Sequence, residues 1–177
     1  QVNWGEINTP KPPWNWWNPR EDELVTQWRT TPFAIDWNND GLTDLISLDF
    51  EGYLAFFERS EIDGQLVLEP GKRIFFDEKN TALRLSEKTA GGSGRRKFTF
   101  VDWDNDGDLD LFLNSRNVDY YENIKQENEK VIFENHGLVF EEQLAGHTTS
   151  PTIVDWDRDG KKELLIGAED GHFYLKK

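Results

Sequence analysis

A segment that occurs three times along the chain constrains the fold more than any other feature. Each copy has a short apolar run, an Asp-Trp pair, an acidic loop with one glycine and a second apolar run. The loops begin at Asp36, Asp102 and Asp155, so the periods are 66 and 53 residues. Periods of this size suit a four-stranded blade of a β-propeller. The chain is therefore expected to be a repeat protein.

Each copy predicts strand, acidic loop, strand, turn and strand, because short apolar runs bounded by turn residues favour strands. No segment shows the pattern of a long amphipathic helix. The predicted strands are 33–35, 45–48 and 53–58 in the first copy, 98–101, 109–113 and 118–122 in the second, and 152–154, 164–166 and 172–175 in the third. A fourth, outer strand is predicted at 66–68 or 73–76 after the first copy and at 131–133 or 138–140 after the second. The third copy has none.

We therefore predict an all-β chain of four-stranded antiparallel β-propeller blades. Residues 29–177 would form three blades, at about 29–76, 96–140 and 148–177. The Trp- and Pro-rich segment 1–28 would pack on the propeller or form a degenerate extra blade. Three copies are few for a closed ring, so we expect a partial propeller of three to four blades or a fragment of a larger one. The remaining blades would lie on a missing segment or a partner chain.

The three loops share the pattern Asp-x-Asp/Asn-x-Asp-Gly-x-x-Asp/Glu, at residues 36–44, 102–110 and 155–163. Oxygens at positions 1, 3 and 5 can point inward together, glycine permits the sharp turn, and the acid at position 9 returns from the next strand. Calcium takes about 6–8 oxygen ligands, whereas magnesium demands a stricter octahedron. Strands rather than helices flank the loops, which argues against an EF-hand. We predict up to three Ca²⁺ sites over the alternative of plain Asx-type hairpin turns.

The predicted ligands are the side chains at positions 1, 3, 5 and 9 and the backbone carbonyl at position 7. They are Asp36, Asn38, Asp40, Leu42 and Asp44 in the first loop, Asp102, Asp104, Asp106, Asp108 and Asp110 in the second, and Asp155, Asp157, Asp159, Lys161 and Glu163 in the third.

The formal net charge of −14 disfavours a nucleic-acid partner, because phosphate binding needs a basic surface. No apolar run approaches the ~20 residues of a membrane span. Cysteine is absent, which excludes disulfides and thiolate metal sites. The lack of methionine predicts a processed chain or a piece of a longer one. Calcium loops fill where free calcium is high, so we expect a secreted, cell-surface or periplasmic protein.

The pattern Val-Asp-Trp-Asp-x-Asp-Gly-x-x-Asp-Leu-Leu resembles the FG-GAP or VCBS repeats of integrin α-subunit propellers and many secreted bacterial proteins. The resemblance covers about residues 30–59, 96–123 and 149–177. The tryptophan after each leading aspartate is more similar to the bacterial branch. Asn38 departs from the acidic pattern, which implies a weaker first site.

The resemblance implies propeller blades that bind calcium, and says little about activity. The bacterial branch includes domains of enzymes that act on polysaccharides. We therefore expect a calcium-binding module directed at polysaccharide. Two alternatives stay open: part of a propeller polysaccharide lyase or glycosidase, and a protein–protein adhesion platform of the integrin kind.

The binding face is predicted opposite the acidic loops, where the segments that enter the first strands converge. These segments bring Arg29, Arg95, Arg96 and His147, with Arg116 and Glu169 at the rim. Arginine binds carboxylate or sulfate in a bidentate fork, so an acidic glycan is the expected ligand. In a lyase, His147 would be the candidate base. The competing interpretation is that the arginines bridge neighbouring blades and that His147 is an ordinary turn residue.

Overall fold

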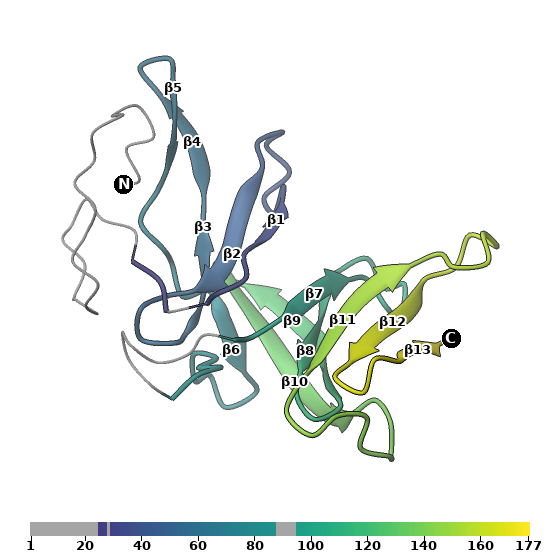
Figure 1. Ribbon diagram of the computed structural model, residues 1–177. Helices are drawn as coiled ribbons and strands as arrows, with labels where there is room; N and C mark the ends of the chain where they lie inside the picture. The colour runs from purple at the N-terminus through teal and green to yellow at the C-terminus, as the bar shows by residue number, and fades with distance from the viewer. Residues whose placement is uncertain (1–24, 28, 88–94) are drawn as a thin grey trace. The chain divides into compact units, whose positions relative to one another are not determined.

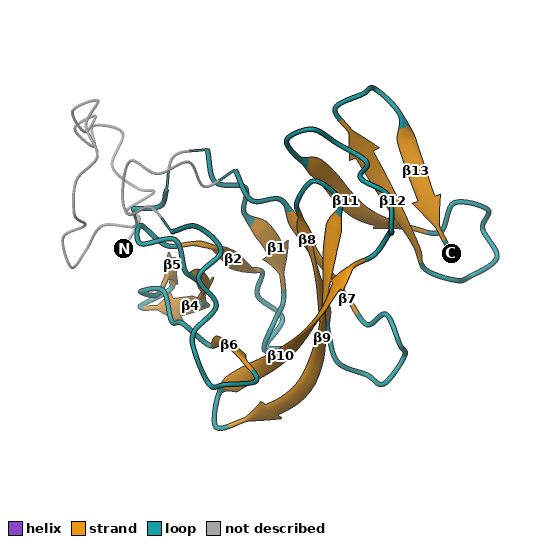
Figure 2. Ribbon diagram, turned by 90° about the horizontal axis from the view of Figure 1, so that it is seen from below, coloured by secondary structure: helices purple, strands orange, loops and turns teal. Residues whose placement is uncertain are grey.

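The structure is a computed structural model that describes residues 25–27, 29–87 and 95–177. Figures 1 and 2 show that every regular element in these residues is a β-strand, which confirms the all-β prediction. No helix that is long and apolar enough to cross a membrane occurs among them. The predicted Trp- and Pro-rich segment lies outside the described residues except for 25–27, so its role stays a prediction.

The chain divides into two compact units. The first comprises residues 1–75 and 82–95, and the second comprises residues 76–81 and 96–177. The first repeat thus lies in the first unit, while the second and third repeats share the second unit.

The first repeat forms an antiparallel sheet of three strands, β1 (Phe33–Ile35), β2 (Asp44–Leu48) and β3 (Leu54–Phe57), in that order. A separate hairpin of β4 (Arg59–Ile62) and β5 (Gln65–Leu68) follows. The prediction of a fourth strand at 66–68 or 73–76 is wrong for this blade. Asp63 and Gly64 adopt positive φ, which suits a two-residue hairpin turn and pairs the first candidate with β4.

The second candidate overlaps β6 (Phe75–Asp77), which joins the sheet of the second repeat instead. The outer edge of β3 is met by isolated bridges rather than by a strand: Phe56 pairs with Lys72, and Tyr53 pairs with Arg84.

The second repeat forms a sheet of order β6-β10-β9-β8-β7. Its own four strands match the predicted blade: β7 (Phe98–Val101), β8 (Asp110–Asn114), β9 (Val118–Glu127) and β10 (Lys130–Leu138). The fourth strand covers the predicted 131–133. The tight β9–β10 turn places Asn128 and Glu129 at positive φ, which gives both strands the length to pair.

The third repeat forms a sheet of three strands, β11 (Thr149–Val154), β12 (Glu163–Ala168) and β13 (Phe173–Lys176). Strand β11 lies beside β7 and β8. The two repeats share one apolar core, because side chains from both sheets bury each other away from water. That core comprises Val101, Phe112, Val118, Leu144, Leu164 and Ile166.

The strand register places the acidic loops. In each repeat the acid at position 9 is the first residue of the second strand and pairs with the last residue of the first strand. The pairs are Ile35 with Asp44, Val101 with Asp110, and Val154 with Glu163. Each loop is therefore closed at its base by a backbone ladder, as the sequence predicts.

Candidate metal centre

The three loops repeat one backbone conformation. In each, the residue at position 4 and the glycine at position 6 have positive φ, a region that glycine and asparagine tolerate best. No heavy atom lies within 4 Å of a Cβ built on the loop glycines, so φ rather than space demands glycine there. The φ values are 58° and 89° at Asn39 and Gly41, 65° and 102° at Asn105 and Gly107, and 60° and 84° at Arg158 and Gly160.

The acid at position 9 ties the loop to the sheet. Asp110 is buried and accepts hydrogen bonds from the backbone N–H groups of Trp103 at 3.0 Å and Asn123 at 2.9 Å. Sequence reasoning assigned this residue only as a ligand and missed its structural role. Its role as a ligand stays a prediction. The bond to the loop tryptophan recurs from Trp37 to Asp44 at 3.0 Å and from Trp156 to Glu163 at 2.6 Å.

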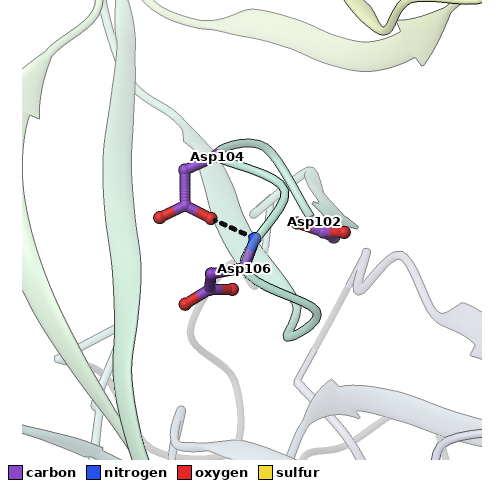
Figure 3. Close-up of side chains that lie close together, drawn as sticks. All are labelled: Asp102, Asp104 and Asp106. Carbon is purple, nitrogen blue, oxygen red and sulfur yellow. Dashed lines mark hydrogen bonds between the residues drawn. The ribbon is translucent and has the colours of Figure 1, made fainter.

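The second loop brings three predicted ligands together. One carboxylate oxygen from each of Asp102, Asp104 and Asp106 lies within 4.8 Å of the others. Figure 3 shows the three side chains around the loop, with the N–H of Asp106 donating to Asp104 Oδ1 at 3.1 Å. Like charges this close repel, unless a cation lies between them.

Buried oxygens without hydrogen bonds surround the same loop. They are Asp102 Oδ1, Asp108 Oδ1 and Asn123 Oδ1. Burial, together with repulsion from the neighbouring aspartates, raises the pKa of Asp108 to about 6. An unsatisfied buried acceptor is costly, and an oxygen-seeking divalent cation would satisfy it. The residues of the second loop therefore fit calcium.

The third loop also brings its first three acids together, with oxygens of Asp155, Asp157 and Asp159 within 4.8 Å. Two lysines neutralise it. Lys161 Nζ lies 3.0 Å from Asp159 Oδ2, and this hydrogen bond lowers the pKa of Asp159. Lys177 Nζ bonds Asp157 Oδ2 and lies 3.4 Å from Glu163 Oε1. Three of the four acids of this loop, Asp157, Asp159 and Glu163, are thus already paired with a lysine.

The polar groups of the first loop form hydrogen bonds with one another. Asp36 accepts hydrogen bonds from the N–H groups of Asp40 at 3.1 Å and Gly41 at 3.0 Å. Asn38 Nδ2 donates to Asp40 Oδ2 at 3.0 Å. With an amide at position 3, this loop holds fewer acids than the other two, as its sequence indicates.

The predicted cationic cluster divides between the two units, with Arg29 and Arg95 in the first and Arg96 and His147 in the second. Arg96 Nη1 donates to the carbonyl of Asn114 at 3.2 Å, so this guanidinium supports its own blade. The convergence of the four side chains stays a prediction.

His147 forms a pair with Glu169 that the sequence did not predict. The ring Nδ1 lies 2.9 Å from Glu169 Oε2, and the backbone N–H of His147 donates to Oε1 at 3.0 Å. Although desolvation raises it, these hydrogen bonds hold the pKa of Glu169 below its ordinary value. The bond to Glu169 fixes the orientation of the imidazole. Because the imidazole is 91% exposed, the edge away from Glu169 faces solvent.

Antiparallel blade sheets, each with an acidic loop between its first two strands, define a β-propeller-like repeat protein. Comparison with known families finds the FG-GAP-like repeat at residues 36–113 and 102–166, which together span more than half of the chain. The chain belongs to this family. A comparison with curated proteins finds no match.

Proposed function

We propose that this chain is a calcium-binding β-propeller module that works outside the cytoplasm, as a secreted, cell-surface or periplasmic protein. The observation that carries the proposal is the set of buried, unbonded oxygens around the second loop. Up to three ions would bind, one in each loop. Free calcium at the cell exterior fills even weak sites, with Kd values of about 10⁻⁴–10⁻³ M.

The second loop would hold calcium through Asp102, Asp104, Asp106 and Asp110, with the carbonyl of Asp108. The ion would supply positive charge where the loop concentrates negative charge. Asp110 would then link the ion to the sheet, because it is already bonded to Trp103 and Asn123. Calcium would therefore stabilise the fold more than it would serve a reaction.

Calorimetric titration of the metal-free chain with Ca²⁺ tests this proposal, with Mg²⁺ as the comparison ion. We expect calcium to bind and to raise the melting temperature, while magnesium at the same concentration does much less. Asp104→Ala should weaken binding at the second loop and leave the other loops able to bind. An unchanged melting curve in calcium and in chelator would contradict structural calcium binding.

We further propose that the partner is an acidic polysaccharide. His147 carries the support in the second unit, since it lies in a segment that enters a first strand and is open to solvent. Glu169 holds Nδ1 of His147, which directs Nε2 outward, as a general base of a lyase would require. The first proposal is a module that binds polysaccharide. The alternatives are part of a propeller polysaccharide lyase or glycosidase, of which this pair favours the lyase, and an integrin-like adhesion platform.

Incubation with uronate-containing polysaccharides separates these possibilities. Unsaturated uronate products, lost in His147→Ala, would establish the lyase. Binding without products would establish the non-catalytic module. Hydrolysis without unsaturated products would favour the glycosidase. A glycan array without hits, together with capture of a defined protein partner, would favour the adhesion platform.

A further inference from the structure

The three loops differ in the balance between carboxylates and nearby cationic side chains. The second loop has five aspartates, at 102, 104, 106, 108 and 110, and Lys162 lies 3.4 Å from the carboxylate of Asp102. The third has four acids, and three of them lie beside a lysine: Asp159 beside Lys161, and Asp157 and Glu163 beside Lys177. The first has three acids and one amide. The second loop therefore concentrates the most uncompensated negative charge.

Asp108 is the residue that sets the second loop apart in sequence. Position 7 is the neutral Leu42 in the first loop, the acidic Asp108 in the second and the basic Lys161 in the third. The backbone N–H of Asp108 donates to Asp106 Oδ1 at 3.0 Å, which holds the residue against the loop. Its own Oδ1 is buried without a hydrogen bond.

The leading aspartate shows the same difference between loops. In the first loop, Asp36 uses both oxygens to accept N–H groups of Asp40 and Gly41. In the third loop, Asp155 Oδ2 accepts the N–H of Gly160 at 3.1 Å. In the second loop, Asp102 keeps a buried oxygen that no described group satisfies. Asp102 therefore keeps a buried oxygen available to an ion, whereas both oxygens of Asp36 are engaged by the protein.

We infer that the second loop binds Ca²⁺ most tightly of the three, and that the side chain of Asp108 sets this order by adding a fifth carboxylate to the site. The inference rests on the proposed calcium binding and adds which loop fills first and which residue decides it. Calcium affinity in protein loops follows the number of charged ligands and the rigidity of the site. An extra negative charge near the ion strengthens binding in a partly desolvated place more than in water.

Calorimetric titration of the full chain with Ca²⁺ alone tests the inference through three variants. Asp108→Asn keeps the shape and removes the charge, and should weaken the tightest site about tenfold. Lys161→Asp places an aspartate at position 7 of the third loop, as in the second loop. It should raise the calcium affinity of the third loop about tenfold. Glu141→Gln removes one charge from an exposed residue outside the loops and should leave all affinities unchanged.

A stability measurement distinguishes a role toward the ion from a role in the fold. In chelator, Asp108→Asn should unfold at the same urea concentration as the parent chain or at a higher one, because it removes repulsion between carboxylates. In calcium, the same variant should gain less stability than the parent. A loss of stability in chelator as large as in calcium would overturn the inference, since Asp108 would then support only the fold.

The outcomes separate this inference from the proposed function. If the parent chain takes up no calcium, calcium binding itself is wrong, and the order of sites with it. If the parent binds calcium but its tightest site survives Asp104→Ala, the order alone is wrong. Equal affinities of Asp108→Asn and Glu141→Gln would show that Asp108 does not decide the order.

Discussion

The second and third repeats carry the same motif in the same loop conformation, yet they differ in their number of strands and in the groups that contact the loop carboxylates. The second has four strands of its own, and buried oxygens in its loop lack hydrogen bonds. The third has three strands, and lysines bond its loop carboxylates. A shared loop sequence thus specifies backbone geometry but leaves the electrostatic state of each site to its neighbours.

Equivalent strand positions show the same contrast in packing. Val118 pairs with Asn114, and Phe173 pairs with Gly167, the same position of the next repeat. Val118 is 0% exposed because residues of the third repeat cover it, whereas Phe173 is 75% exposed. In a repeat protein each unit buries its neighbour's apolar face, so burial depends on what lies next along the stack.

The largest expected effect comes from the core that joins these repeats. Phe112→Ala should cost about 3–5 kcal/mol of unfolding free energy, because Phe112 is 1% exposed and leaves a cavity. Phe173→Ala should change it by at most about 0.5 kcal/mol, as for most surface positions. Urea unfolding followed by circular dichroism provides both values. Equal losses would show that a partner covers Phe173 in solution.

The next effect concerns the metal. With calcium at about a hundred times the Kd of the second loop, binding should stabilise the fold by about 2.7 kcal/mol. Asp104→Ala should remove most of this gain, whereas Asp157→Ala in the third loop should remove little. Melting curves in calcium and in chelator test the comparison. A larger loss from Asp157→Ala would reverse the proposed order of the two loops.

A pH effect should distinguish the loops in chelator. The pKa of Asp108 is about 6 in the folded chain, above the ordinary value of 3.8, because burial disfavours the charged form. The folded state then binds the proton more tightly, so stability from this group rises as pH falls from about 7 through 6. Comparison of the parent with Asp108→Asn by urea unfolding at pH 7.5 and pH 5 isolates the effect. Parallel pH profiles would contradict it.

The smallest effect should come from Lys177. Its ammonium competes with a cation for Asp157 and Glu163, and exposed ion pairs contribute little. Lys177→Gln should therefore raise calcium affinity at the third loop only about two- to fivefold. Titration of this variant in an Asp104→Ala background provides the value, with Lys176→Gln as the neighbouring control. Unchanged affinity would remove Lys177 from the comparison.

Local features of the chain were predictable because their causes are local. The hairpin around each loop follows from apolar runs on both sides of an Asx- and Gly-rich segment. The glycine at position 6 follows from a backbone turn that few other residues adopt. Of the strands, the outer ones after the first repeat were predicted wrongly. The first candidate pairs with its neighbour at 59–62 instead of extending the blade. The second lies in 75–77, which pairs with the second repeat, and nothing within that segment itself indicates the choice.

The amino-acid sequence by itself determined the all-β repeat, the position of each loop and the identity of its acids. The repeat period, the turn residues and the charges can each be read from short stretches of consecutive residues. The tertiary structure alone decided which oxygens are buried without hydrogen bonds and which sheet the strand at 75–77 joins. It also paired His147 with Glu169 and fixed each position-9 acid to a backbone N–H. The pairs Lys177–Asp157 and His147–Glu169 join residues about twenty positions apart. Such pairs depend on how the strands are arranged, so no local pattern specifies them.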